Sequence, residues 1–368
     1  MKAILTGGGT GGHIYPGLAI AKGIEMNYEK AEILFVGTNE GLEAEIVPKA
    51  GYELANISSR GLPRKLSIEI LTSLVTTGIG VWEAKKLINT FKPDIVIGTG
   101  GYVSGPVMLM ASLMKKKTVI HEQNAYPGLT NRLLSRLVDK VALSNQDAES
   151  YFNGNSKLVL TGNPVRPEII KARRLESYKE LGLDPNKKFI LVFGGSRGAK
   201  SINQAMEEVY KLSQKNPEIQ VLHITGKNDF ARVREVATKL GISNLKNGHI
   251  IIKPYLYNMA AGLAAADLVI SRAGATGLAE ITARGIPAIL IPYPYAAENH
   301  QEHNARSLER RGAAKVILDH DLNGVKLVNE IQELIFDQER LDKMAKASKK
   351  LGKPKAVDNI IKLIDELI

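Results

Sequence analysis

Residues 2–13 read KAILTGGGTGGH, and this stretch decides the fold class. A short apolar run of the kind found in buried strands, residues 3–5, leads into five glycines that are interrupted by Thr10 and followed by His13. A glycine turn between a strand and a helix lets the backbone approach a ligand closely, and the helix N-terminus offers free N–H groups to an anion. The stretch therefore predicts a strand–turn–helix unit that binds an anionic group.

The second half of the chain begins in the same way. Residues 190–193 read ILVF, and the glycine-rich turn GGSRG follows them at residues 194–198. Ser196 takes the place that Thr10 has in the first turn, where a hydroxyl adds a hydrogen-bond donor. Two such turns that face each other would form a cleft with an anion site on each wall.

Short runs rich in isoleucine and valine alternate with longer helical patterns along the whole chain. They lie at residues 3–5, 33–36, 95–97, 118–120, 141–143 and 158–160, and again at 189–193, 221–224, 250–252, 268–270, 288–291 and 316–318. This alternation predicts doubly wound parallel sheets. The stretch TGNPVRP between the two series is typical of a linker. We therefore predict two α/β domains, 1–162 and 163–344, with a last helix that is free to pack on either.

The composition excludes several classes of protein. Of the 368 residues, 44% are hydrophobic and 24% charged, and no apolar stretch reaches the roughly 18 residues that a membrane span needs. A basic-then-apolar leader pattern is absent and there is no cysteine, so a reducing cytoplasm is expected. The net charge of +11 attracts polyanions, but aromatic residues make up only 5% and no helix-turn-helix pattern occurs. No nucleic-acid partner is therefore expected.

Two nucleotide-binding motifs are matched only in part. Gly7, Gly9 and Gly12 satisfy G-x-G-x-x-G, but the second predicted strand ends without the acid that would hold a ribose in a dinucleotide fold. Residues 194–201 nearly satisfy the P-loop pattern, but Ala199 replaces its second glycine and crowds the loop. The sequence thus argues against both a dehydrogenase and a nucleoside triphosphatase.

A metal site is not expected either. Asp319 and Asp321 resemble the D-x-D with which many glycosyltransferases bind a metal-diphosphate, but they stand just before a helical pattern and are interpreted as helix caps. No other cluster of Asp, Glu or His has metal-ligand spacing.

A third glycine-containing turn, SRAGATGLAE at residues 271–280, again follows a predicted strand and opens a helix. A diphosphate at the helix start would leave Glu280 placed to accept hydrogen bonds from a ribose diol. Alternatively, Glu280 is only a favourable negative charge near the start of a helix. Local sequence does not separate these two interpretations.

Seven motifs in order carry a resemblance to a known family: GGTGGH at 8–13, GGYVSGP at 100–106, HEQN at 121–124, GNPVR at 162–166, GGSRGA at 194–199, SRAGATGLAE at 271–280 and HQEHNA at 300–305. Together they resemble the MurG family. These peptidoglycan glycosyltransferases add N-acetylglucosamine, from UDP-N-acetylglucosamine, to undecaprenyl-diphosphate-linked muramyl pentapeptide (lipid I) and so form lipid II. The resemblance runs from about residue 4 to the final helix.

The resemblance implies an α/β fold of the GT-B class, with two Rossmann-like, doubly wound parallel-sheet domains around a central cleft. Residues 1–162 would form the acceptor- and membrane-facing domain, and a C-terminal helix at about 345–368 would pack back on it. Residues 163–344 would form the domain that binds the UDP-sugar. Neither a cofactor nor a metal is implied.

The resemblance also implies binding residues. Those for the donor are Thr10, Gly11, Gly12, Asn124, Arg166, Ser196, Leu256, Ala275, Thr276, Glu280 and Gln301. Those for the acceptor are Gly9, His13, Gly101, Tyr102 and Ser104. The backbone of Leu256 would meet the uracil, and Gln301 is placed by its neighbours Asn304 and Ala305.

An inverting transfer needs a base for the proton of the attacking hydroxyl and stabilisation of the leaving diphosphate. His13 is the first candidate for the base, since the ordinary pKa of imidazole is about 6.5. Glu122, in HEQN, is the rival candidate, because it also follows a predicted strand. A third interpretation makes His13 a helix-start residue that only bonds the neighbouring backbone.

One segment suggests contact with a membrane surface. Residues 66–82 are apolar but too short to span a bilayer, and Arg60, Arg64 and Lys65 precede them while Lys85 and Lys86 follow. With residues 115–117 and Trp82, they predict peripheral docking on anionic inner-leaflet lipid, at the cytoplasmic face of the plasma membrane. The alternative is an ordinary helix that buries its apolar residues against the sheet.

Two other functions stay open at this point. One is a GT-B glycosyltransferase with another lipid or natural-product acceptor, against which the motifs GGTGGH and GGYVSGP argue. The other is a non-catalytic nucleotide-sugar or lipid-carrier binding protein, which would bind without turnover.

Overall fold

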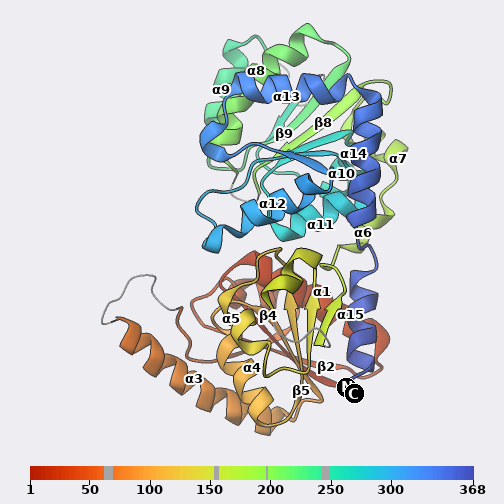
Figure 1. The fold of residues 1–368 in the computed structure, drawn as a ribbon. Helices are drawn as coiled ribbons and strands as arrows, with labels where there is room; N and C mark the ends of the chain where they lie inside the picture. The colour runs from red at the N-terminus through yellow and green to blue at the C-terminus, as the bar shows by residue number, and fades with distance from the viewer. Residues whose placement is uncertain (62–68, 153–156, 196–197, 243–248) are drawn as a thin grey trace. The chain divides into compact units, whose positions relative to one another are not determined.

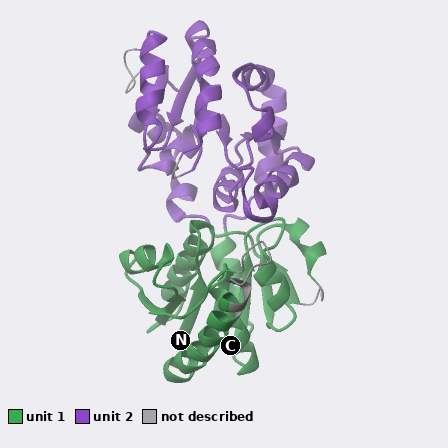
Figure 2. Cartoon of the chain, turned by 90° about the vertical axis from the view of Figure 1, so that its left-hand side faces the viewer, with its two compact units in different colours: residues 1–164, 355–368 green, residues 165–354 purple. Residues whose placement is uncertain are grey.

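The computed structural model describes residues 1–61, 69–152, 157–195, 198–242 and 249–368. It divides into two compact units (Figure 2). Unit 1 comprises Met1–Pro164 together with Lys355–Ile368, and unit 2 comprises Val165–Pro354.

Unit 1 contains a seven-stranded parallel sheet in the order β3-β2-β1-β4-β5-β6-β7. Its strands are β1 (Lys2–Gly7), β2 (Glu32–Gly37), β3 (Glu53–Asn56), β4 (Ile95–Gly100), β5 (Lys117–Glu122), β6 (Lys140–Leu143) and β7 (Leu158–Leu160). Its α-helices are α1 (Gly11–Asn27), α2 (Glu43–Lys49), α3 (Glu69–Phe91), α4 (Ser104–Leu113), α5 (Leu129–Leu134) and α15 (Ala356–Asp365).

Helices cover both faces of this sheet (Figure 1). Neighbouring strand residues point to opposite faces, so Ile4 packs in the cluster that includes residues of α3 and α4, while Leu5 packs with residues of α1 and α15. Strands buried on both faces read as continuous apolar runs, which is why the six runs expected here are all confirmed as strands. The seventh strand, β3, was missed because ELAN lacks such a run and lies at the edge of the sheet.

Unit 2 contains a six-stranded parallel sheet in the order β10-β9-β8-β11-β12-β13. Its strands are β8 (Lys188–Phe193), β9 (Ile219–Ile224), β10 (Ile250–Lys253), β11 (Leu268–Ser271), β12 (Ala288–Leu290) and β13 (Ala314–Val316). Its α-helices are α6 (Pro167–Lys171), α7 (Arg174–Leu181), α8 (Lys200–Lys215), α9 (Phe230–Lys239), α10 (Met259–Ala265), α11 (Ala275–Arg284), α12 (His300–Arg310), α13 (Gly324–Ile335) and α14 (Gln338–Leu351).

The last strand and the C-terminal helix differ in detail from the expectation. Strand β13 begins two residues earlier than predicted, at Ala314, which pairs with Ala288 of β12. The stretch at about 345–368, which was expected to form one helix, contains parts of two helices, α14 and α15. Helix α14 contacts α11 and belongs to unit 2, residues Gly352 and Pro354 interrupt the helical pattern, and α15 contacts α1 in unit 1.

Each sheet has one point at which the strand order reverses. In unit 1 it lies between β1 and β4, and in unit 2 between β8 and β11. In open α/β sheets, ligands bind outside the carboxyl ends of the strands at such a switch point. The turns with the quoted glycine motifs follow these four strands, so the topology places them where a ligand is expected.

Candidate active site

The glycine turn of unit 1 is held against the neighbouring strand end. Gly9 and Gly101 have φ angles of +78° and +84°, which side-chain-bearing residues rarely adopt. A Cβ atom on Gly101 would also lie 2.4 Å from the carbonyl oxygen of Gly8. The turns after β1 and β4 therefore pack closely at the switch point, which only glycine permits.

A buried carboxylate that the sequence did not single out supports this turn. Glu43, at the start of α2, is fully buried and accepts hydrogen bonds from the backbone N–H of Gly9 at 2.9 Å and from the hydroxyl of Thr38 at 2.8 Å. Its carboxylate fills the space that a side chain on Gly8 would need. Glu43 belongs to no recognisable motif, so the sequence did not indicate its role. Helix α2 and the first glycine turn come together only in the folded chain.

Helix α1 begins at Gly11 directly after this turn. Its N-cap, Thr10, makes no side-chain capping bond, and its first turn contains no acidic residue. The same holds for α4, α8 and α11, the other helices that follow the four switch-point strands, whereas Asn323 and Asp337 cap α13 and α14. Uncapped N-termini without acidic residues leave N–H groups and dipole available to an anion.

His13, in the first turn of α1, is fixed through one ring nitrogen. Its Nδ1 lies 2.9 Å from the carbonyl oxygen of Thr99 and 3.2 Å from Oε1 of Gln123. Both partners are acceptors, so Nδ1 carries the proton and donates. Both side-chain hydrogen bonds of His13 within the described part of the chain are made by Nδ1, so Nε2 keeps its lone pair in the neutral ring.

Burial lowers the pKa of His13 below its ordinary value, while the bonds to Gln123 and Thr99 and the charge of Glu43 act in the opposite direction. The ring is therefore neutral at pH 7. A neutral imidazole with a free Nε2 is able to accept a proton.

Glu122, at the end of β5, has both carboxylate oxygens engaged. Oε1 accepts from the backbone N–H of Asn124 at 2.9 Å and from its side-chain amide at 3.2 Å. Oε2 accepts from the backbone N–H of Gly128 at 3.1 Å and from the amide of Asn131 at 2.8 Å. Burial raises the pKa of Glu122, and these four donors oppose the rise. The carboxylate shapes the loop after β5 and orients Asn124.

The remaining acceptor candidates lie beside the same turn. The ring of Tyr102 stands over Gly9, and its hydroxyl lies 3.4 Å from that of Thr38. Ser104 is buried, and its hydroxyl donates to the carbonyl oxygen of Gly101 at 3.0 Å. The structure thus brings the unit 1 candidates together at the ends of β1, β4 and β5.

In unit 2, Glu280 lies on α11, one turn in from the uncapped end that contains Ala275 and Thr276. Glu280 is 7% exposed and forms a bidentate ion pair with Arg166, with Nε–Oε1 and Nη2–Oε2 distances of 2.7 and 3.2 Å. The carboxylate of Glu280 raises the pKa of Arg166. Glu280 is therefore a buried acceptor with a partner of its own, and not merely a favourable charge in the first turn.

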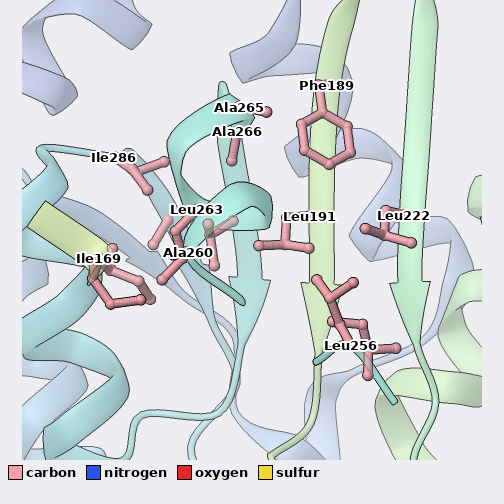
Figure 3. Packing of buried hydrophobic residues seen from close by; sticks show 14 of the residues in the cluster. Ile169, Phe189, Leu191, Leu222, Leu256, Ala260, Leu263, Ala265, Ala266 and Ile286 are labelled. Carbon is pink, nitrogen blue, oxygen red and sulfur yellow. The ribbon is translucent and has the colours of Figure 1, made fainter. Parts of the chain in front are cut away.

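Gln301 and Leu256 also lie in unit 2. Oε1 of Gln301 accepts from the backbone N–H groups of Ala273 and Tyr293, at 3.1 and 3.0 Å, and so ties the turn before α11 to the loop after β12. The side chain of Leu256 is buried beside Leu191 in the core (Figure 3), which leaves only its backbone for a ligand. Ser196 lies outside the described residues.

The interpretation of Asp319 and Asp321 as helix caps is wrong. The side chain of Asn323 caps α13 by accepting from the backbone N–H of Lys326 at 2.9 Å. Asp319 instead binds Arg272 at 2.5 Å and accepts from the hydroxyl of Ser201 at 2.6 Å. No group of three or more His, Cys, Asp or Glu that could hold a metal occurs within the described ranges.

Comparison with known proteins agrees with this architecture. Residues 3–143 match the glycosyltransferase family 28 N-terminal domain, and residues 189–360 match the family 28 C-terminal domain. UDP-N-acetylglucosamine--N-acetylmuramyl-(pentapeptide) pyrophosphoryl-undecaprenol N-acetylglucosamine transferases of Halothermothrix orenii and Desulforamulus reducens are 53% and 51% identical, over 100% of this chain and 99% of theirs. The crystal structure of Acinetobacter baumannii MurG superposes with a TM-score of 0.79 at 27% identity, covering 99% of both chains.

The chain belongs to the MurG family of glycosyltransferases. The predicted fold class, two Rossmann-like parallel-sheet domains as in GT-B enzymes, is thereby confirmed. A UDP-N-acetylglucosamine 2-epimerase of Neisseria meningitidis, bound to UDP-GlcNAc, also superposes with a TM-score of 0.69, but at 16% identity it shares only the fold. MurG membership therefore rests on the full-length sequence relationship and not on architecture.

Proposed function

We propose that this chain transfers N-acetylglucosamine from UDP-N-acetylglucosamine to the C4 hydroxyl of the muramyl sugar in lipid I, and so forms lipid II for peptidoglycan. The observation that carries the proposal is the free Nε2 of a neutral His13 beside the glycine turn of unit 1. The names of the relatives, which span the full chain, supply the substrates.

In the proposed reaction, the C4 oxygen attacks the anomeric carbon of the donor while the bond from that carbon to the UDP oxygen breaks, with inversion. Nε2 of His13 takes the proton of the hydroxyl. The leaving diphosphate is stabilised by the uncapped N-terminus of α11 at Ala275 and Thr276, and by the guanidinium of Arg166.

Other residues complete the two substrate sites. Glu280 would accept hydrogen bonds from the ribose diol, and the backbone at Leu256 would meet the uracil. Glu122 has no unoccupied oxygen, so its proposed role is to position Asn124 toward the donor. Gly9–Gly12 and Gly101–Ser104 would hold the acceptor and the transferred sugar.

The direct test incubates the protein with UDP-N-acetylglucosamine and a water-soluble, short-chain lipid I analogue. Disaccharide product and UDP should appear in equal amounts. The matched control is the same analogue with hydrogen in place of the C4 hydroxyl, which should bind but give no product. Binding of both substrates without turnover would indicate a binding protein, and transfer only to an unrelated lipid acceptor would indicate another glycosyltransferase.

A lipid-linked acceptor requires the enzyme to meet the membrane, and α3 offers a surface for this. Val75, Ile79 and Trp82 share one face of the helix and are all exposed, Trp82 at 66%. Lys85 and Lys86 follow on α3, and Lys115 and Lys117 lie after α4, which contacts α3. An exposed apolar stripe with neighbouring cations suits reversible docking on anionic headgroups.

This surface supports peripheral association with anionic lipid at the cytoplasmic face of the plasma membrane. None of the helices in the described part of the chain is both long and apolar enough to cross a bilayer. Arg64 and Lys65, which the sequence assigned to the same surface, lie outside the described residues.

A further inference from the structure

Gln123 lies between two histidines in the buried network behind the glycine turn. It directly follows β5, is 4% exposed, and its side chain contacts His13, Thr99 and His121. We propose that Gln123 is a positioning residue that fixes the tautomer of His13, so that Nε2 is always the nitrogen that accepts the proton. The proposal rests on the proposed function of His13.

The orientation of the Gln123 amide is determined by its nitrogen. Nε2 lies 2.8 Å from the carbonyl oxygen of Thr99, 3.0 Å from that of His121 and 3.0 Å from Nδ1 of the His121 ring. A flipped amide would direct its oxygen at two carbonyl oxygens, which repel it. The amide oxygen therefore faces Nδ1 of His13.

The tautomer of His121 is also fixed, so the hydrogen bond between Gln123 and His121 has only one possible direction. Its Nε2 lies 3.0 Å from the carbonyl oxygen of Gly162, so that nitrogen bears the proton and donates. Its Nδ1 is then the acceptor that the Gln123 amide requires. Burial lowers the pKa of His121 to about 4, so this ring stays neutral and keeps the same tautomer at pH 7.

A base that exchanged between two tautomers would present a lone pair to the substrate for only part of the time. Thr99 alone gives Nδ1 one acceptor, and Gln123 adds the second. The amide oxygen also stabilises the imidazolium that forms when Nε2 takes the proton. The titratable groups that face His13 are His121 of β5, within this network, and Glu43 of α2, outside it, and neither is altered in the variants below.

The test compares Gln123→Met and Gln123→Glu with the wild type. Methionine at position 123 removes the second hydrogen-bond acceptor for Nδ1 of His13. The acid limb of kcat/KM plotted against pH, which reports the pKa of His13 under the proposed function, should therefore move to lower pH by about half a unit or more. In the same variant, kcat should fall about 10-fold or more. The glutamate keeps an acceptor for Nδ1 of His13, although its second oxygen replaces the donor that faces the carbonyl oxygens of Thr99 and His121. In this variant the limb should therefore not move to lower pH, and kcat should fall less than in Gln123→Met. A purely structural role does not predict that only the variant without an acceptor shifts the limb.

The matched control is Gln220→Met. Gln220 is also buried, and its amide bonds both backbone groups of Asp184 at 2.8 Å, but it lies in unit 2 and its side chain makes no hydrogen bond to a histidine within the described residues. The Gln220→Met variant should be less stable than the wild type, but the acid limb of its kcat/KM profile should not shift. Equal effects of Gln123→Met and Gln220→Met on kcat, with no shift of the limb in either, would overturn the proposal.

Nitrogen-15 spectra of histidine-labelled protein test the tautomer without turnover. The His13 signals, assigned by their loss in His13→Gln, should show a protonated Nδ1 and an unprotonated Nε2 in the wild type and in Gln123→Glu, and a tautomer mixture in Gln123→Met. An unchanged tautomer in Gln123→Met would reject the positioning role. A wild type with the expected tautomer but no transfer to lipid I would instead reject the proposed function.

Discussion

The two switch points share a topology but differ in their side chains. In unit 1 the turn after β1 is held by the buried Glu43 and followed by His13, while His121 and Glu122 lie at the end of β5, each with its hydrogen-bond partners. In unit 2 the turn after β11 has a helix N-terminus and the ion pair of Arg166 with Glu280. The histidines and carboxylates of unit 1 are chemically able to transfer a proton. The helix N-terminus and the ion pair of unit 2 are able to bind an anion and a diol. Under the proposed function, the same fold element would support acceptor activation in one unit and donor binding in the other.

The largest effect is expected from the proton acceptor of unit 1. His13→Ala should lower kcat by roughly 100- to 10,000-fold, because a general base is lost, while UDP still binds through unit 2. Steady-state kinetics and calorimetric titration with UDP check the two parts. His320→Ala, an exposed histidine of unit 2, is the control. Activity within a few-fold of wild type would move the role to Glu122 or to water, and acceptor affinity is measured in the same variant.

Buried histidines should also make stability depend on pH. The pKa of His121 is about 4 in the folded protein against an ordinary 6.5, so the unfolded chain binds the proton first as the pH falls. The stabilisation is complete above pH 6.5 and decreases between pH 6.5 and 4, by about 3 kcal/mol.

Urea unfolding at several pH values measures this loss. His223 of unit 2, with a pKa of about 3, should extend it to lower pH. His121→Gln should flatten the dependence between pH 6.5 and 4. The same slope in wild type and variant would mean that other groups cause the loss.

In unit 2, Glu280→Ala should raise the KM for UDP-N-acetylglucosamine by about 10- to 100-fold and change kcat much less. Hydrogen bonds to a charged group contribute about 1.5–3 kcal/mol, and the ribose is remote from the reacting carbon. Glu168→Ala is the control, since Glu168 is an exposed carboxylate 4.0 Å from the same Arg166. A donor KM that stays at the wild-type value would remove Glu280 from the site.

Binding to anionic membranes should depend on unit 1 and not on unit 2. Reversal of Lys85 and Lys86 to glutamate should weaken binding to anionic vesicles about 10-fold or more, since each basic residue near the surface contributes about 1 kcal/mol. Activity on a water-soluble acceptor should not change. Reversal of the exposed Lys346 and Lys350 on α14 of unit 2 is the control. Loss of vesicle binding in the α14 variant alone would place the docking surface in unit 2.

The smallest effect is expected from metal removal. Excess EDTA should leave turnover unchanged, because helix N-termini and Arg166 are proposed to stabilise the leaving diphosphate. Asp321→Asn should likewise have little effect, since Asp321 is exposed. Complete loss of activity in EDTA, restored by magnesium, would revive a metal-diphosphate mechanism at Asp319 and Asp321.

Much of the fold was predictable because strands buried on both faces are continuous apolar runs, and glycine turns follow them at fixed places. The edge strand β3 has no such run and was missed. The role of Asp319 was mistaken for a similar reason. Local sequence shows a nearby helix start, but not that Arg272, 47 positions away, lies beside the carboxylate.

The sequence by itself determined the fold class, the family and the motifs that contain His13, Glu122 and Glu280. These features depend on residue types at short spacings, which the linear chain displays. The tertiary structure alone decided the protonation and partners of those residues. Glu43, Thr99 and Gln123 reach the first turn only because β4, β5 and α2 meet there, and burial and hydrogen bonding then set which nitrogen of His13 is free.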